Sequence, residues 1–244
     1  MHRFFVEPSA LAGEWAILSG PQAHQLLHVL RLRPGARILL LDDTGWEYEA
    51  ELISLGTREA QARIRARRPS TGEPRIRVTL YQAVLRGPRF EWVLQKGTEL
   101  GVSAFVPIVT ARCVAVPRDA QAKLVRWETI IREAAEQAGR GCLPRVSLPV
   151  AFAEACATVR TEGALIAWEE ERGTGLRAAL DESRGRETSW ALFIGPEGGF
   201  TSEEVAFAQS HNIRPAHLGP RTLRAETASI AAMAALFYAL GEWG

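Results

Sequence analysis

The chain contains 244 residues, of which 47% are hydrophobic and 23% are charged, and its formal net charge is +1. This composition is typical of a globular protein with one large domain or two modest ones. The longest apolar stretch, residues 225–240, includes Glu226 and is shorter than the roughly 20 residues of a membrane span. The N-terminus also lacks the long apolar core of a signal peptide. We therefore expect a cytoplasmic protein without a membrane segment.

The three cysteines, Cys113, Cys142 and Cys156, are widely spaced and form no C-x-x-C pair. This pattern favours a reducing compartment and argues against a disulfide framework or a zinc ribbon. His24 and His28 are four residues apart and would share one face of a helix, but the sequence offers no third ligand nearby. We therefore expect no metal site.

Charge is distributed unevenly along the chain. Residues 58–77 carry a net charge of +5 and residues 86–145 carry +4, whereas residues 146–244 carry −5. A polyanion would therefore be met by the first and middle parts of the chain. On this evidence alone, a nucleic-acid partner and a simple solvated surface remain equally acceptable interpretations.

Residues 1–70 are predicted to form a β-rich domain. The runs 37–41 and 46–52 flank a turn at 42–45, which indicates a hairpin, and residues 60–66 alternate as a half-buried strand does. A short helix is predicted over 21–32. Several short strands separated by turns favour a small barrel, and the Pro- and Gly-containing segment 69–74 is the predicted domain boundary.

From residue 74 to residue 244 the pattern alternates between strands and helices, which predicts a doubly wound α/β domain. The elements follow hydrophobic periodicity and helix-capping signals. The predicted strands are 76–85, 105–109, 164–168, 190–194 and 216–218, and the predicted helices are 89–100, 119–138, 201–209 and 225–240.

In such a sheet the ligand site lies beyond the carboxyl ends of the strands. The loop Gly195–Phe200 follows a buried strand, and its three glycines let the backbone approach a ligand closely. Glu197 within this loop disfavours a phosphate cradle, and the dinucleotide-binding pattern G-x-G-x-x-G is absent. This loop therefore favours a neutral or cationic ligand.

A second loop, Leu218–Thr227, again follows a strand and opens a helix. The helix macrodipole partly explains Glu226 at this position. Arg221 and Arg224 are less easily explained, because cations are unfavourable at a helix N-terminus. Such a conflict between local structure and residue type is expected at a functional site.

These loops carry a family resemblance. Gly195-Pro-Glu-Gly-Gly-Phe200 followed by Leu218-Gly-x-Arg-x-Leu-Arg-x-Glu-Thr-Ala228 resembles the SPOUT superfamily of knotted methyltransferases, and within it the bacterial 16S ribosomal RNA uracil-N3 methyltransferases. Further matches extend over almost the whole chain. They are His28–Arg33 with Gly35, Gln95–Val102, Pro107 with Arg112, Arg126-Trp127, Glu133–Gln137 and Arg140.

The resemblance implies a PUA-like barrel for RNA docking over residues 1–70 and a SPOUT domain over residues 74–244 that is tied in a deep trefoil knot. It implies a homodimer whose active sites draw on both subunits, with 16S rRNA in the 30S subunit as substrate. It also implies S-adenosylmethionine as the methyl donor, bound in the knot. The expected donor-binding residues are Leu165, Ile166, Ala167, Gly195, Pro196, Glu197, Gly198, Gly199, Leu218, Gly219 and Leu223.

Uracil N3 must lose its proton before it can attack a methyl group, so positive groups are needed near the developing negative charge. Arg224 is the first candidate for this role, Arg221 is expected to bind donor or RNA, and Glu226 is expected to orient an arginine. Glu197, His217 and hydroxide all remain candidates for the general base. The expected phosphate contacts are Arg31, Arg33, Lys96, Arg112, Arg126, Arg132 and Arg140.

Two alternatives remain open at this stage. One is a SPOUT enzyme with another RNA target, such as a ribose 2′-oxygen or guanine N1. The other is a non-catalytic ribosome-assembly factor in which the barrel alone binds RNA.

Overall fold

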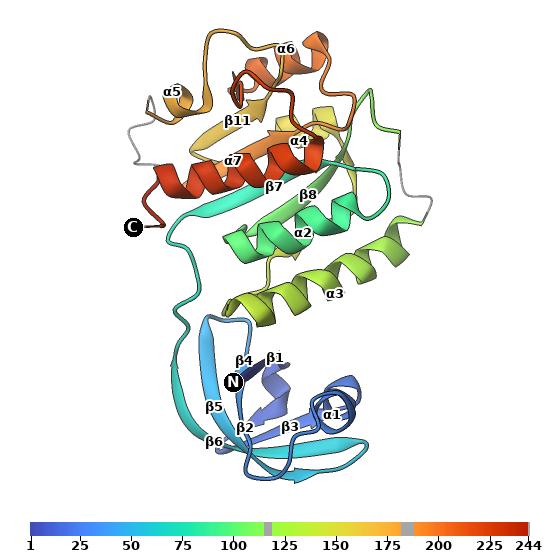
Figure 1. The fold of residues 1–244 in the computed structure, drawn as a ribbon, viewed down its shortest axis with the longest axis vertical. Coiled ribbons are helices and arrows are strands. Elements are labelled where there is room, and N and C mark those ends of the chain that lie inside the picture. Colours follow the sequence, from blue (N-terminus) through green and yellow to red (C-terminus); the bar gives the residue numbers. More distant parts are fainter. Residues whose placement is uncertain (115–118, 182–187, 244) are drawn as a thin grey trace. The chain divides into compact units, whose positions relative to one another are not determined.

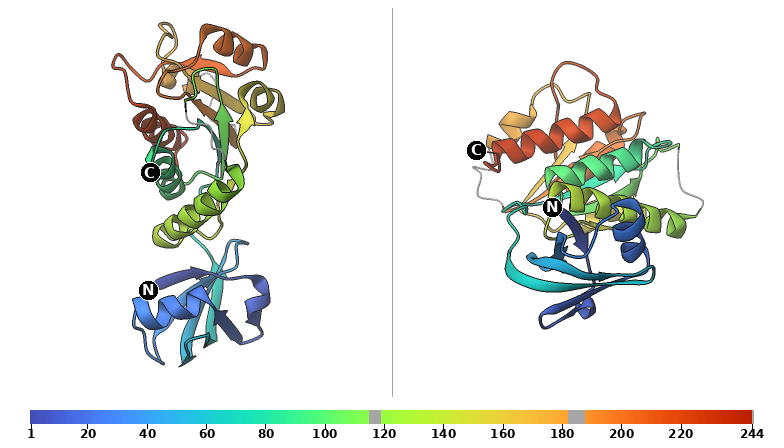
Figure 2. Two further views of the ribbon diagram at one scale, coloured as in Figure 1. Left: turned by 90° about the vertical axis from the view of Figure 1, so that its right-hand side faces the viewer. Right: turned by 60° about the horizontal axis from the view of Figure 1, so that its bottom comes forward.

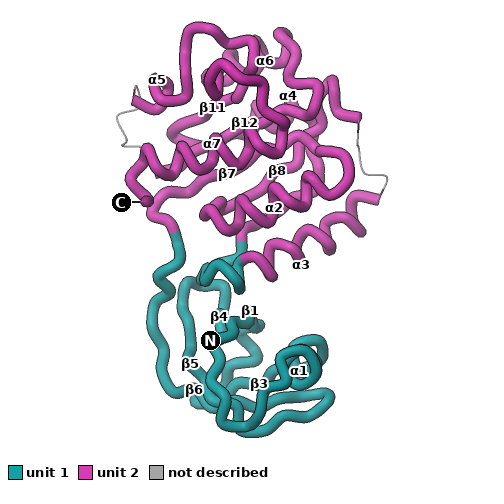
Figure 3. The backbone as a smooth tube through the Cα atoms, viewed as in Figure 1, with its two compact units in different colours: residues 1–73, 135–143 teal, residues 74–134, 144–244 magenta. Residues whose placement is uncertain are grey.

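The computed structural model describes residues 1–114, 119–181 and 188–243. The chain forms two compact units (Figure 3). Unit 1 contains residues 1–73 and 135–143, and unit 2 contains residues 74–134 and 144–244. No helix in the described ranges is both long and apolar enough to cross a membrane.

Unit 1 is built on one six-stranded sheet with the strand order β1-β4-β5-β6-β3-β2. The strands are β1 (His2–Phe5), β2 (Leu11–Ala12), β3 (Trp15–Ser19), β4 (Arg37–Leu41), β5 (Trp46–Leu55) and β6 (Glu59–Pro69). β1 and β4 are parallel, and the remaining pairs are antiparallel. The predicted hairpin is confirmed, since β4 and β5 pair across the turn at 42–45. Strand pairing leaves the sheet open between β1 and β2 in the described chain.

The helix predicted over 21–32 is shorter than expected. After the single 3₁₀ turn η1 (Pro8–Ala10), an α-helical turn α1 (Pro21–His24) passes directly into the five-residue π-turn η2 (Gln25–Val29). Ala23 and Leu26 from this segment pack with alternate strand residues such as Leu18, Leu40 and Leu52 in the core of unit 1. The helix ends before Leu32 because the backbone of Arg31 turns to a positive φ of 51°.

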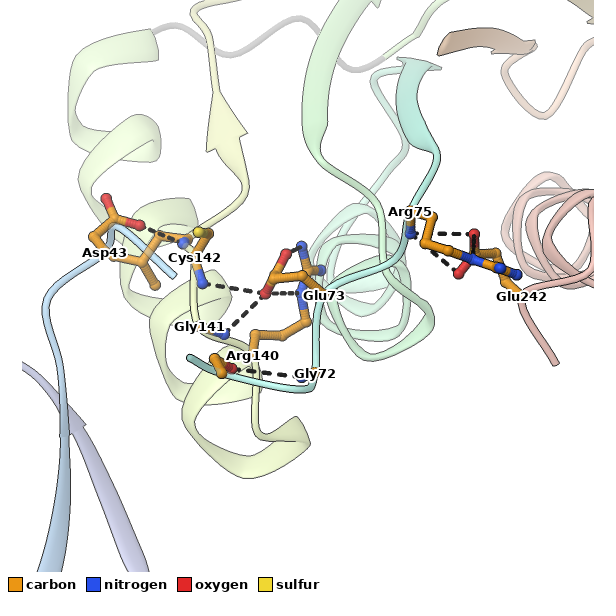
Figure 4. A network of polar contacts seen from close by, with 10 residues as sticks. Asp43, Gly72, Glu73, Arg75, Arg140, Gly141, Cys142 and Glu242 are labelled. Atoms are coloured by element: carbon orange, nitrogen blue, oxygen red, sulfur yellow. Dashed lines mark hydrogen bonds and ion pairs between the residues drawn. The ribbon is translucent and has the colours of Figure 1, made fainter. Parts of the chain in front are cut away.

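The segment 135–143 belongs to unit 1 through specific contacts. Ala135 and Leu143 pack against Phe5 and Leu41 in a small apolar cluster. Glu73 accepts hydrogen bonds from Arg140 Nε (2.9 Å) and Nη2 (2.8 Å), and from the backbone N–H groups of Gly141 and Cys142, as Figure 4 shows. A distant piece of chain is therefore part of the structure of this unit.

Unit 2 contains a parallel sheet with the order β10-β8-β7-β12-β11-β13, and β9 pairs beside β8. Its strands are β7 (Arg77–Ala83), β8 (Ala104–Val109), β9 (Arg145–Val146), β10 (Val150–Ala151), β11 (Gly163–Ala167), β12 (Ser189–Ile194) and β13 (Arg214–Ala216). The central strands are continuous apolar runs because both faces of the sheet are covered. The predicted α/β class is confirmed for this part of the chain.

The helices of unit 2 form two layers, one on each face of the sheet (Figures 1 and 2). Alternate strand residues point to opposite faces of the sheet. Leu80, Leu165 and Leu192 lie in one core, and Tyr81, Ile166 and Phe193 lie in the other. The first core is shared with α2 (Arg89–Leu100), α3 (Ala120–Ala138), α5 (Leu176–Asp181) and α7 (Ala225–Ala239). The second is shared with α4 (Phe152–Thr158) and α6 (Ser202–Ser210).

Candidate functional site

Three loops meet at one edge of the sheet in unit 2. β12, β11 and β13 are neighbours in that order and all run parallel, so the segments that follow them emerge on the same side. These segments line two adjoining cavities of about 430 Å³ and about 230 Å³, which we call together the strand-end cleft. The larger cavity alone falls within the size range of small-molecule sites.

The two cavities of the strand-end cleft share part of their lining. Residues that line both are Ala167, Glu169, Thr222, Leu223 and Ala228. The larger cavity is completed by Arg89, Ile194, Gly195, Pro196, Glu197, Gly199, Arg224, Ala225 and Glu226. The smaller one is completed by Trp168, Glu170, Arg172, Leu218, Gly219, Pro220 and Arg221.

The glycine loop after β12 is tightly folded. The N–H of Gly199 donates to the carbonyl of Pro196 (3.0 Å). Gly199 has a φ of +69°, a backbone angle that residues other than glycine rarely adopt. Phe200 is buried in the second core, and Thr201 then caps α6 in a reciprocal capping box with Glu204. The loop is thus held at both ends by buried structure.

Arg112 supports this loop and lines neither cavity of the cleft. Its Nη1 donates to the carbonyl of Gly198 (2.8 Å), and a Cβ at Gly198 would lie only 3.2 Å from Cβ of Arg112. Gly198 therefore needs its small size to make room for Arg112. Gly198 was predicted to bind the donor, but it does not line the cleft.

The loop after β13 places its two arginines in different cavities. Gly219, with a φ of +99°, turns the chain, and its N–H donates to Nδ1 of His217 (3.1 Å). Arg221 lines the smaller cavity and Arg224 lines the larger one. Arg224 has an extended backbone and is the residue immediately before α7, so the helix begins one residue after it.

A third arginine joins this group from another element. Arg89 is the first residue of α2, and its Nη1 lies 3.2 Å from Oε1 of Glu197. Its Nε lies 3.7 Å from Oε1 of Glu226. The backbone N–H of Arg86 also donates to Oε1 of Glu197 (3.1 Å). Arg89 therefore connects the carboxylate of the glycine loop with that of α7.

Arg89 was not among the site residues predicted from the sequence. Glu226 was predicted to orient an arginine, and the arginine within ion-pair distance among the described residues is Arg89 rather than Arg221 or Arg224. A signal was nonetheless present, since Arg89 is a cation at a helix N-terminus, the same conflict that singled out Arg221 and Arg224.

Apart from Gly198, the expected donor-binding residues divide into two sets. Those that line the strand-end cleft are Ala167, Gly195, Pro196, Glu197, Gly199, Leu218, Gly219 and Leu223. Leu165 and Ile166 form the second set. They lie in the two cores, are 1% and 0% exposed, and anchor β11 within the sheet.

The expected phosphate contacts differ in their availability. Arg31 and Arg33 are exposed in unit 1. In unit 2, Lys96 pairs with Glu99 (2.8 Å) and Arg126 with Glu91 (3.4 Å). Arg140 is 3% exposed and engages Glu73 with two guanidinium nitrogens. Its side chain is therefore a structural link inside unit 1, in a position from which a phosphate is not accessible.

Metal-ligating residues do not gather in the described ranges: no group of three or more His, Cys, Asp or Glu side chains lies within reach of one ion. The rings of His24 and His28 are 4.7 Å apart, as their helical spacing predicts.

Comparisons with known proteins place this fold and site in a family. Residues 72–237 match the family described as RNA methyltransferase domain, and residues 18–65 match the RNA methyltransferase PUA domain. The chain therefore belongs to the RNA methyltransferases.

Its relatives define the group more closely. The chain is 32% identical to ribosomal RNA small subunit methyltransferase E of Bacillus subtilis, over 98% of this chain and 96% of that protein. It superposes on the Neisseria gonorrhoeae ribosomal RNA small subunit methyltransferase E, solved with bound S-adenosyl methionine, with a TM-score of 0.91, 32% identity and full coverage of both chains. A Legionella pneumophila protein in complex with the same cofactor gives a TM-score of 0.88 and 31% identity over 97% of each chain.

Proposed function

We propose that the protein transfers a methyl group from S-adenosylmethionine to N3 of a uridine in the 16S rRNA of the small ribosomal subunit. The observation that carries this proposal is the strand-end cleft, which the motif loops Gly195–Phe200 and Leu218–Thr227 line in a chain of the RNA methyltransferase family. The names of the relatives support the ribosomal substrate, and two similar structures that hold S-adenosylmethionine support the donor.

The residues of the cleft fit that donor. Gly195, Gly219 and Leu223 present backbone and small apolar surface, which suits the flat adenine group. Glu169, Glu197 and Glu226 supply negative charge in the lining, which suits a ligand with a sulfonium and an ammonium group. The bound donor supplies an electrophilic methyl group, and the cleft residues hold it and position it against the RNA base.

The chain's own catalytic task is to stabilise the base as it loses its N3 proton. Arg224 at the larger cavity is placed to attract the negative charge that develops on the uracil oxygens. Arg221, in the adjoining cavity, contacts donor or RNA. Glu197 and His217 remain candidate bases beside hydroxide. Each already has a hydrogen-bond partner, the N–H of Arg86 for Glu197 and the N–H of Gly219 for His217.

We assign RNA docking to the N-terminal region and methyl transfer to the C-terminal one, divided at residues 70–74, with a PUA-like barrel in the first and a SPOUT trefoil knot in the second. Arg31 and Arg33 contact phosphate on unit 1. On unit 2, Lys96, Arg112, Arg126 and Arg132 are the candidate contacts, of which Arg112 is also needed by the glycine loop. Arg140 is left out of the proposed RNA contacts because it is buried.

The proposal includes a homodimer acting in the cytoplasm on the 30S subunit. The end of α7 supports an interface, because Tyr238 and Trp243 are 71% and 50% exposed beside an apolar pocket that also includes Leu176 and Leu180. Large exposed apolar side chains in one patch commonly mark protein contacts.

The test is methyl transfer from labelled S-adenosylmethionine to 30S subunits and to naked 16S rRNA, followed by mapping of the modified atom. Label at uracil N3 supports the proposal. Label at a ribose 2′-oxygen or at guanine N1 would show that the enzyme methylates a different RNA atom. RNA binding without methyl transfer would identify a non-catalytic factor.

A further inference from the structure

Arg89 lies between two carboxylates of the strand-end cleft and contacts one oxygen of each. Both the Arg89–Glu197 and the Arg89–Glu226 contacts involve Oε1. The three residues belong to three segments, the start of α2, the glycine loop and the first turn of α7. A single guanidinium with several donors in a fixed plane is suited to hold two carboxylates at a set distance.

The other oxygen of Glu226 is in a different situation. Its Oε2 is buried and accepts no hydrogen bond from any described residue, while the side chain as a whole is 14% exposed. A buried carboxylate oxygen without a partner is costly. Glu226 also lines the larger cavity. An oxygen in this position is therefore suited to accept a hydrogen bond from a ligand.

We propose that Arg89 is a positioning residue: it holds Glu226 through Oε1, so that Oε2 is directed to an N–H group of the ligand in the cleft. This inference rests on the proposed function and adds to it the residue that orders the carboxylate. Two ligands of that reaction carry suitable N–H groups, namely the methyl donor, on its amino acid part and on its adenine, and the uracil, at ring N3.

The experiment is a double-mutant cycle with Arg89→Met and Glu226→Gln, which remove charge and keep most of the shape. Arg89→Lys tests whether a cation without the planar fork is sufficient. The matched control is Lys123→Met, because Lys123 Nζ pairs with Glu91 Oε1 at 3.8 Å outside the cleft. Thermal melting checks that every variant is folded.

Two readouts separate the two possible N–H donors. Calorimetry measures the Kd for S-adenosylmethionine and for 5′-methylthioadenosine, which lacks the amino acid part. Single-turnover assays with saturating donor measure transfer to RNA. Loss of affinity for the full donor alone identifies the amino acid part that 5′-methylthioadenosine lacks, loss of affinity for both identifies the adenine, and a slower transfer at unchanged Kd identifies the base.

We expect Arg89→Met either to raise the Kd for S-adenosylmethionine or to slow methyl transfer, in each case roughly ten- to hundredfold, the scale of a hydrogen bond to a charged group. Arg89→Lys should recover only part of this loss. In the Glu226→Gln background, Arg89→Met should change the same quantity by less than about threefold, because Arg89 acts through Glu226. Lys123→Met should resemble the parent.

The inference is overturned if Arg89→Met leaves both the Kd and the transfer rate within about twofold of the parent. It is also overturned if Arg89→Met changes the affected quantity by the same factor in the Glu226→Gln background as in the parent. The proposed function is tested separately, since it fails only if the parent protein itself does not methylate RNA.

Discussion

Arg224 immediately precedes α7 and lines the same cavity as Glu197 and Glu226. A cation at a helix N-terminus is unfavourable until an anion approaches, which suits a group that acts on a developing negative charge. We expect Arg224→Ala to lower methyl transfer about a hundredfold or more, the effect of removing one preorganised charge-stabilising group. Single-turnover rates at saturating donor and RNA would measure this.

Arg224→Lys should recover little of that rate, because a point charge does not reproduce a planar fork. Donor affinity should stay within a few-fold of the parent in both variants. A near-parental rate for Arg224→Ala would transfer the role to Arg221 or to an arginine of a second subunit.

Asp42 begins the turn between β4 and β5 and is 8% exposed. Burial favours the neutral form of its carboxyl group. Hydrogen bonds from the Thr44 hydroxyl (2.6 Å), the Tyr48 hydroxyl (2.8 Å) and the Thr44 N–H (3.0 Å) outweigh this effect and lower the pKa of Asp42 below its ordinary value of 3.8. The ionised carboxylate is therefore what stabilises the turn.

Because the pKa is lower in the folded than in the unfolded state, the stabilisation is present above about pH 3.8 and is lost as the pH falls through the folded pKa. Asp42→Asn should lower the free energy of unfolding by about 1–3 kcal/mol at pH 7 and by less at pH 3. Urea unfolding at both pH values tests this, with Glu7→Gln as an exposed control. An equal loss at pH 7 and pH 3 would contradict the assignment.

At the level of elements, the cleft depends on how three loops after parallel strands come together. Thr222 is exposed and lines both cavities, so a large side chain at this position should fill the cleft without entering a core. We expect Thr222→Trp to raise the Kd for S-adenosylmethionine at least about tenfold, a loss of roughly 1.4 kcal/mol. Calorimetry and a melting curve measure affinity and folding.

Gln121→Trp, at an exposed position of α3, is the control for the added indole. Unchanged affinity in a folded Thr222→Trp protein would contradict the placement of the donor in the strand-end cleft. Gly198 is a poorer place for this test, because a side chain there meets Arg112 first.

Long elements with a clear period could be predicted from the sequence. α2 spans the expected residues and ends at Gly101, whose φ of +112° stops the helix, and Thr201 caps α6. The short elements β1 to β3, β9, β10, α4 and α5 were missed, because strands of a few residues and helices of one or two turns contain too little periodicity.

In the candidate site, features that depend on local sequence could be predicted, and features that depend on distant contacts could not. Glycine content and arginines at an unfavourable helix end identified two of the three loops of the cleft, those after β12 and β13, since those signals are local. Arg89 was missed because its partner Glu197 lies 108 residues away, and sequence charge does not reveal pairing across that distance. For the same reason Arg140 was grouped with exposed arginines, although Glu73 holds it in the interior of unit 1.

At the level of the whole molecule, the two units are not two consecutive pieces of chain. Unit 1 ends at Glu73 and is resumed only at Ala135–Leu143. The later piece contributes Glu136, whose Oε1 accepts the N–H of Phe5 (2.9 Å), in addition to Ala135, Leu143 and the partners of Glu73. A single domain boundary near residue 70 therefore separates Glu73 and residues 135–143 from the strands of unit 1 with which they form one compact unit.

This arrangement has a consequence for synthesis on the ribosome. When Glu73 has been made, 143 − 73 = 70 further residues must follow before Leu143 exists. At about 5–20 residues per second this takes roughly 4–14 s. During that interval Phe5 and Leu41 lack Ala135 and Leu143, and the Glu73 carboxylate lacks its hydrogen-bond donors. The N-terminal unit is thus made first but completed only after more than half of the chain has been translated.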